Sequence, residues 1–145
     1  MLISIDTLPQ SVVLELITAL DAELAYRLTQ SVDLSDYSIK LSKYARFVVA
    51  RSEDKIVGLI AFYENHNARE LYVPYVCTSV NHRKQGVANL LLNKLIEYSN
   101  SMNCNVALEV LKTNVAAVSL YNKFGFKICS ESESKYQMKR FIKLD

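Results

Sequence analysis

The first part of the chain places apolar residues at helical spacing. Over residues 9–30 they recur every three or four positions and form one stripe. The stripe comprises Val13, Leu16, Ile17, Leu20, Leu24 and Leu28. Pro9 is tolerated in a first turn, and a break near residue 21 fits the pattern. Asp33 or Ser35 can cap a further short helix that carries Tyr37, Leu41 and Tyr44.

The pattern then changes to one typical of strands. Residues 46–51 and 56–64 are rich in β-branched and aromatic residues, and the four residues between them, Ser-Glu-Asp-Lys, predict a hairpin. A polar loop leads to a third predicted strand, Glu70–Val80. Because Pro74 cannot donate a ladder hydrogen bond, we expect an edge position or a β-bulge there.

The second half alternates strands and helices. A helix over about 86–101 has a predicted core face of Ala88, Leu91, Leu92, Leu95 and Met102. A strand over Asn105–Leu111 precedes a helix over Asn114–Phe124, which Gly125 closes and onto which Phe126 can fold back. Residues 126–130 and 136–142 predict a final hairpin. The predicted order is two helices, three strands, helix, strand, helix and two strands. It indicates an α/β or α+β fold with at least one parallel pair in a mixed sheet.

Composition narrows the class of protein. The 145 residues are half apolar, which fits one globular domain over residues 1–145. The net charge is +2 without a run of Lys and Arg, so we expect no nucleic-acid partner. No apolar run is long enough to span a membrane, and no N-terminal signal-like pattern occurs, so we expect a cytoplasmic protein with no membrane partner.

The three cysteines do not predict a disulfide framework or a zinc site. Cys77, Cys104 and Cys129 are far apart, and none belongs to a CxxC pair. Cys77 and Cys129 lie in strand-like apolar runs, so we expect both thiols to be buried. We expect no metal.

Residues 81–88 form a potential anion site. A strand enters, a short loop turns, and a helix begins at Gly86. The first amides of a helix lack intrahelical acceptors and lie at the positive end of its dipole. Gly86 lets the backbone approach a phosphate, and Arg83 and Lys84 add positive charge. The loop lacks the GxxxxGK[ST] and GxGxxG patterns. For the hexapeptide alone, an ordinary strand-to-helix connection with a glycine and a surface Arg-Lys pair is the simpler explanation.

Two blocks of residues resemble a known family. Arg83-x-x-Gly86-x-Ala88 resembles the [QR]-x-x-G-x-[GA] signature of the GNAT superfamily of acyl-CoA N-acyltransferases. Leu108-Glu109-Val110, Asn114, Ala117, Leu120-Tyr121 and Phe124-Gly125-Phe126 are similar to the family's second block. The resemblance covers residues 46–142. It implies a mixed, mostly antiparallel twisted sheet of about six to seven strands, about four helices, and central strands that splay apart.

The resemblance also implies a co-substrate, acetyl-CoA or another short acyl-CoA. Its pantetheine arm would lie between the splayed strands, and backbone amides at the loop would hold its pyrophosphate. The implied binding residues are Thr78, Ser79, Val80, Arg83, Lys84, Gln85, Gly86, Val87, Ala88, Asn114, Tyr121 and Lys123. An N-cap role for Asn114 and a plain exposed position for Lys123 are the alternatives from the residues alone.

Acyl transfer to an amine needs a base and a stabilised leaving thiolate. The resemblance makes Tyr121 the proton donor to the thiolate, whereas its apolar neighbours alone favour a core tyrosine. Glu109 is the candidate base, because the matching glutamate serves that role in family members that acetylate protein N-termini. A structural carboxylate at Glu109, the alternatives Glu64 and Glu70, and deprotonation through water all stay open.

The acceptor is the least defined part of the sequence-based hypothesis. The residues Tyr26, Tyr37, Tyr44, Tyr63, Tyr72 and Tyr75 are expected to border it. Such walls suit a small-molecule amine, for example an amino sugar or amino acid, and suit a peptide terminus nearly as well. A non-catalytic acyl-CoA-binding module is a further alternative. We expect His66 and His82 to be surface residues and the protein to be a monomer or homodimer.

Overall fold

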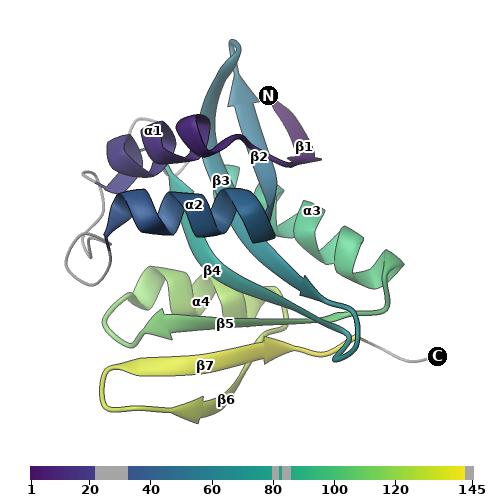
Figure 1. Cartoon of the computed structure of the whole chain (residues 1–145). Coiled ribbons are helices and arrows are strands. Elements are labelled where there is room, and N and C mark those ends of the chain that lie inside the picture. The colour runs from purple at the N-terminus through teal and green to yellow at the C-terminus, as the bar shows by residue number, and fades with distance from the viewer. Residues whose placement is uncertain (22–32, 80–81, 83–85, 143–145) are drawn as a thin grey trace.

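One twisted sheet organises the described part of the chain, residues 1–21, 33–79, 82 and 86–142 of a computed structural model (Figure 1). Within these residues the sheet has seven strands in the order β1-β2-β3-β4-β5-β7-β6, with four helices. The strands are β1 (Leu2–Asp6), β2 (Arg46–Ser52), β3 (Lys55–Asn65), β4 (Glu70–Thr78), β5 (Asn105–Leu111), β6 (Lys127–Glu131) and β7 (Lys135–Arg140). The helices are α1 (Gln10–Asp21), α2 (Leu34–Tyr44), α3 (Val87–Ser101) and α4 (Val115–Lys123).

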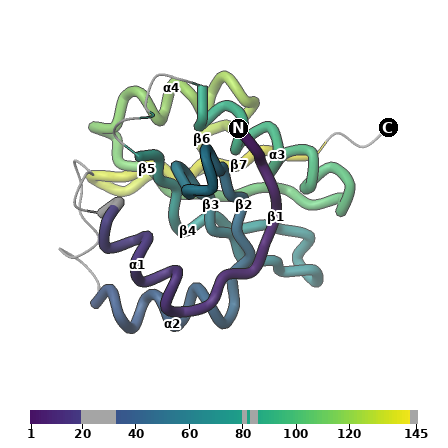
Figure 2. The backbone as a smooth tube through the Cα atoms, turned by 90° about the horizontal axis from the view of Figure 1, so that it is seen from above, coloured from purple at the N-terminus to yellow at the C-terminus, as the bar shows by residue number. Residues whose placement is uncertain are grey.

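The helices cover the sheet in two layers. Figure 2 shows α1 and α2 on one face and α3 and α4 on the other. Each layer has its own core, because successive strand residues point to opposite faces. Val13, Ile17 and Leu41 pack against one side of β2, β3 and β4, whereas α3, α4 and Phe126 pack against the other. No helix within the described ranges is long and apolar enough to cross a membrane.

The single parallel pair of the sheet joins β4 and β5, and the other neighbouring strands are antiparallel. Their pairing runs only from Glu70 with Asn105 to Val73 with Leu108. Beyond Val73 the two strands continue without pairing to each other. The expected mixed, mostly antiparallel sheet with splayed central strands is therefore confirmed.

Pro74 lies at a β-bulge in an internal strand. Ala61 pairs with Tyr75 and Tyr63 with Tyr72, so Val73 and Pro74 together oppose the single residue Phe62. The bulge alternative is confirmed and the edge alternative is not. The bulge disrupts the ladder locally and bends the strand. It occurs at the point where β4 leaves β5.

Three sequence-based expectations are wrong, and a fourth is only partly covered by the described residues. Residues 2–6 form an edge strand that the helical interpretation of residues 1–45 omitted. Met102 is 41% exposed, and Val87 takes the core position instead. Cys129 is exposed because every residue of edge strand β6 is exposed, while Cys77 is buried as expected. Of the helix predicted over 9–30, the structure describes α1, and the remainder lies outside the described residues.

Candidate active site

The unpaired halves of β4 and β5 form the first part of the site. The Ser79 amide donates to the Val57 carbonyl at 2.8 Å, so the Ser79 backbone faces β3. Because backbone groups alternate along a strand, Val76 and Thr78 turn theirs toward the β5 side. Of the residues predicted to bond a pantetheine arm, Thr78 therefore turns its backbone toward the β5 side, whereas Ser79 turns its amide to β3. Val80, predicted to contribute as well, lies outside the described residues.

The N-terminus of α3 forms the second part. Gly86 is its N-cap, with φ of 78° in the left-handed region, and no side chain of the described residues caps the helix. A Cβ built on Gly86 would have no heavy atom of the described residues within 4 Å, so the glycine itself borders open space. This geometry fits a phosphate group, which needs close backbone approach at a helix N-terminus. The predicted contributors Arg83, Lys84 and Gln85 lie outside the described residues.

Val87 and Ala88 begin α3 in different surroundings. The Val87 side chain is 1% exposed and packs in the core between sheet and helix. Only its backbone can therefore face the loop. Ala88 is half-buried at the same end of the helix. Any contact of Val87 with a ligand in front of α3 would therefore be through its main chain.

Tyr121 of α4 is buried next to Phe126. Its side chain is 7% exposed, and the two ring centroids lie 5.6 Å apart. The Phe126 amide donates to the Tyr121 carbonyl at 3.0 Å, which folds the chain back after Gly125. Burial raises the pKa of Tyr121 to about 12. The ring is a core element, and its hydroxyl is protonated at neutral pH.

Asn114 and Lys123 mark the two ends of α4. The Asn114 side chain accepts from the Ala117 amide at 3.2 Å, which confirms the N-cap prediction. Lys123 is exposed in the last turn. The nine-residue separation corresponds to roughly 13 Å along the helix, so these two side chains reach different places.

Glu109 lies one residue beyond the last β4–β5 pair. Its neighbours Leu108 and Val110 point into the core, and its own side chain points to the opposite face of β5. Lys135 Nζ lies 2.9 Å from Glu109 Oε1, and Gln137 Nε2 donates to Glu109 Oε2. The hydrogen bond from Lys135, opposed by partial burial and assisted by Gln137, lowers the pKa of Glu109. The carboxylate is ionised at neutral pH.

Lys135 and Gln137 are the polar partners of Glu109 that sequence reasoning did not single out. Both belong to β7, whose alternation places Lys135, Gln137 and Lys139 on one face. That alternation was visible in the sequence. Their position beside Glu109 depends on the β5–β7 register, in which Glu109 pairs with Gln137 and Leu111 with Lys135.

The alternative base Glu64 belongs to a different cluster. Its carboxylate is 3.0 Å from Arg46 Nη1 and 3.2 Å from His66 Nε2, and it accepts from the Tyr98 hydroxyl at 2.9 Å. This cluster lies at the end of β3 that pairs with the start of β4. The eight-residue rise from Glu70 to Thr78 separates the two ends of β4 by roughly 26 Å. Glu64 therefore lies far from Thr78, the end of β4 that leads to α3.

The alternative base Glu70 begins β4 and pairs with Lys139 at 2.9 Å. It precedes the strand divergence by three residues, whereas Glu109 follows it by one. Among the three carboxylates considered, Glu109 is the one next to the opening between the strands. His66 is exposed, as expected. His82 is half-buried, and its amide donates to the Ser79 carbonyl at 2.9 Å.

Four of the six predicted acceptor-side tyrosines come from α2, β3 and β4. Tyr37 and Tyr75 have ring centroids 6.5 Å apart, and the Tyr37 hydroxyl donates to the Pro74 carbonyl at 3.4 Å. Tyr63 pairs with Tyr72 across the strands, and Lys40 Nζ lies 5.7 Å from the Tyr63 ring. These four tyrosines form an aromatic wall on the Glu109 side of the sheet. Tyr44 is exposed, and Tyr26 lies outside the described residues.

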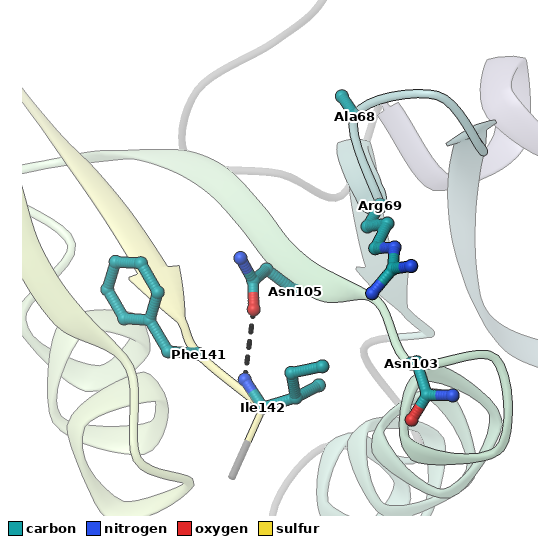
Figure 3. A pocket seen from close by; sticks show the side chains of 6 residues that line it. All are labelled: Ala68, Arg69, Asn103, Asn105, Phe141 and Ile142. Carbon is teal, nitrogen blue, oxygen red and sulfur yellow. Dashed lines mark hydrogen bonds between the residues drawn. The ribbon is translucent and has the colours of Figure 1, made fainter. Parts of the chain in front are cut away.

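A separate hollow of about 320 Å³ lies at the other end of β4 and β5 (Figure 3). It is lined by Ala68, Arg69, Asn103, Asn105, Phe141 and Ile142. The Ile142 amide donates to Asn105 Oδ1 at 2.9 Å, which ties the end of the last strand to the start of β5. The hollow is remote from Gly86, since it surrounds the first residues of the two strands. Within the described ranges, no group of three or more His, Cys, Asp and Glu residues is arranged to hold a metal.

Known proteins share this fold. The chain superposes on the ribosomal-protein-S18-alanine N-acetyltransferase from Escherichia coli with a TM-score of 0.81 and 15% identity, over 99% of this chain and 96% of that chain. It superposes on the PaiA N-acetyltransferase from Thermoplasma acidophilum in complex with coenzyme A with a TM-score of 0.76 and 16% identity, over 98% of this chain and 100% of that chain. For the spermidine N-acetyltransferase SpeG chimera from Vibrio cholerae and hSSAT, the TM-score is 0.78 and the identity 21%, over 96% of this chain and 95% of that chain.

The sequence comparison supplies the family. The pattern of the acetyltransferase (GNAT) family matches residues 15–126, which is most of the chain. The match includes the loop before α3, the divergence of β4 and β5, and Tyr121. The chain therefore belongs to the GNAT acetyltransferase family and is an acyltransferase.

Proposed function

We propose that the protein transfers an acetyl group from acetyl-CoA to the primary amine of a small molecule, by direct attack in a ternary complex. The observation that carries this proposal is the position of Glu109. Its ionised carboxylate lies one residue past the point where β4 and β5 separate. The diverging end of β4 lies beside the N-terminus of α3, because Thr78 pairs with Gly58 and Gly58 packs against Val87. A base and a pyrophosphate site thus flank one gap in the sheet.

In this proposal acetyl-CoA supplies an acyl group activated as a thioester. Backbone amides at the start of α3 bind its pyrophosphate, and the β5-facing backbone of Val76 and Thr78 aligns the arm that carries the thioester. Lys123 and Asn114 offer further polar contacts along α4. The proposed binding residues Val80, Arg83, Lys84 and Gln85 complete this track.

Glu109 takes the proton that the acceptor amine must lose. A free alkylammonium has a pKa of roughly 10, so most of it is unreactive at neutral pH. The nitrogen lone pair then forms the new C–N bond as the C–S bond breaks. Tyr121 donates a hydrogen bond to the departing sulfur. Both side chains act in the charge state that they hold near pH 7.

The tyrosine wall supports a small acceptor. Tyr37, Tyr63, Tyr72 and Tyr75 give an apolar surface with hydroxyl groups on the side of the sheet where Glu109 projects. Flat rings with a polar edge suit a compact amine that carries hydroxyl or carboxyl groups. The surroundings of Glu109 favour a second candidate, the terminal amine of a peptide. The Glu109 side chain is 33% exposed, so an extended peptide can reach the carboxylate from solvent.

A thiol-release assay with acetyl-CoA tests the proposal across amino sugars, amino acids, polyamines and short peptides with free N-termini. We expect release with at least one small amine at a kcat/KM at least tenfold above that for the peptides. Faster release with peptides would replace the first candidate with the second. No release from any amine, together with acetyl-CoA binding in calorimetry, would make the protein a binding module.

A further inference from the structure

β7 provides Glu109 with two partners on one face of the sheet. Lys135 Nζ is 2.9 Å from Glu109 Oε1, and Gln137 bonds the other carboxylate oxygen. Both oxygens are thus engaged at once, each by a residue of the neighbouring strand. Because the β5–β7 register is antiparallel and continuous from Val106 to Leu111, the strand backbone fixes the partners' positions.

This double contact limits the carboxylate's freedom. A glutamate side chain on an exposed strand face has several accessible rotamers, and losing that freedom has an entropic cost. Lys135 and Gln137 offset this cost before any acceptor binds. A base held within hydrogen-bond reach of its target is more effective than one that must find its pose in each cycle.

We infer that Lys135 is a positioning residue for the acyl-transfer reaction, which holds Glu109 beside the opening between β4 and β5. The inference rests on the proposed function of Glu109 as the base. Lys135 touches neither reacting group in this assignment. It acts through the carboxylate, and Gln137 assists it from the next outward position of the same strand.

The charged surroundings of Glu109 make this role measurable. On β7 it faces the Lys135 ammonium and the neutral Gln137 amide. On β4 it faces Tyr72, whose pKa is raised by burial and by the nearby Glu109 carboxylate, so this tyrosine stays neutral. Glu70 and Lys139 form their own pair farther along the same face. Lys135 is therefore the cation in contact with Glu109 among the described residues.

The Lys135 ammonium sets the direction in which the pH profile of the reaction should move. The Lys135 ammonium favours the ionised carboxylate and lowers the pKa of Glu109. A base must be ionised to accept a proton, so kcat/KM falls as pH drops through that pKa. Removing the ammonium raises the pKa of Glu109 and moves the acid limb of the kcat/KM profile to higher pH.

The test compares Lys135→Met with Lys135→Arg and Lys139→Met. For Lys135→Met we expect the acid limb to shift upward by about one pH unit, with roughly tenfold lower kcat/KM below the limb. Lys135→Arg keeps the cation and should keep most of the wild-type profile. Lys139→Met removes a similarly exposed cation of the same strand and face, but one that pairs with Glu70, and should leave the limb unchanged.

Two further measurements separate the possible failures. The carboxyl ¹³C shift of Glu109, followed by NMR titration, should report a higher pKa in Lys135→Met without any turnover. An unmoved acid limb in that variant would overturn the role of Lys135, provided Glu109→Gln is inactive. If Glu109→Gln kept the wild-type profile, Glu109 would not be the base, and the inference would fall with that assignment. An equal shift in Lys139→Met would also overturn it, in favour of a general surface-charge effect.

Discussion

At the scale of single residues, the environment of Tyr121 decides what its hydroxyl can do. Burial raises its pKa to about 12, so the group is protonated throughout the working range of most enzymes. Complete proton transfer to a thiolate with a pKa near 8.5 would be uphill by roughly 5 kcal/mol. Tyr121 is therefore better suited to donate a hydrogen bond to the leaving sulfur than to release its proton early.

Tyr121→Phe removes the hydroxyl and keeps the ring that packs on Phe126. We expect kcat to fall about 100-fold, because the leaving thiolate loses its donor, while the Kd for acetyl-CoA changes less than about threefold. Single-turnover rates and calorimetric titration measure the two quantities. A thermal unfolding midpoint close to wild type serves as the control for packing. Unchanged kcat would remove Tyr121 from the mechanism.

Gly86→Ala tests the anion site at the start of α3. The left-handed φ of 78° disfavours a Cβ by about 1 kcal/mol, although the free protein has space for it. A phosphate that approaches the amides closely would meet that Cβ, so we expect the Kd for acetyl-CoA to rise at least tenfold. Gly125→Ala is the matched control, since its φ of 91° imposes similar strain after α4. An equal loss of affinity in both variants would assign the effect to strain alone.

At the scale of elements, the contact between β3 and α3 sets how closely the helix approaches the sheet. A Cβ on Gly58 would lie 2.9 Å from Val87 Cγ1 and 3.3 Å from the Cys77 carbonyl oxygen. Only glycine permits this approach without displacement of the helix start. Since Gly86 immediately precedes Val87, the same contact positions the proposed pyrophosphate site.

Gly58→Ala should lower the free energy of unfolding by about 1–3 kcal/mol through overpacking. Val87→Ala relieves part of the clash, so the double variant should be more stable than the sum of the single effects by about 1 kcal/mol. Urea unfolding of all four proteins gives this coupling energy. Additive losses would show that Gly58 and Val87 do not limit each other.

The bulge at Val73 and Pro74 is the element-scale feature that opens the site. An unbroken parallel ladder would pair β4 with β5 to their ends and leave no backbone groups for a cofactor arm. The bulge bends β4 away directly after the Val73–Leu108 pair. Pro74 has no N–H to donate to a neighbouring strand. A central strand tolerates it here because β4 diverges from β5 at this position.

At the scale of the whole molecule, the two ends of β4 have separate tasks. One end leads to the loop before α3. At the other end, Arg46 of β2, Glu64 of β3 and Tyr98 of α3 form a hydrogen-bonded cluster. Glu64 is 13% exposed, so this ion pair is screened less than a surface pair. Through Tyr98, the cluster links the β2–β3 hairpin to α3.

Glu64→Gln should therefore change stability and not catalysis. We expect the free energy of unfolding to fall by about 1–2 kcal/mol, because the ion pair with Arg46 is lost and the hydrogen bond from Tyr98 becomes a neutral one. The kcat/KM profile should keep its acid limb. Chemical denaturation and pH-dependent rates check both parts. Loss of the acid limb in this variant would make Glu64 the base in place of Glu109.

Local sequence patterns were sufficient to predict most of the helices and strands and to identify the family. The helical stripe around Leu91 and Leu95, the alternation around Leu108 and the caps Asp33 and Asn114 all depend on neighbours within a few residues. Such short-range rules hold in any fold, so these predictions were confirmed. The edge strand β1 was missed because its five residues pair with a distant strand and have little local signal.

Tertiary structure alone decided which side chains meet. Whether Pro74 bends an edge or an internal strand depends on the order of strands, which no local pattern contains. The exposure of Cys129 and Met102 depends on what covers them. Lys135 follows Glu109 by twenty-six positions, and only the β5–β7 register brings the ammonium to the carboxylate. The sequence by itself determined the residue types available for acyl transfer; the pairing of strands determined their neighbours, because contact across a sheet depends on register and not on distance along the chain.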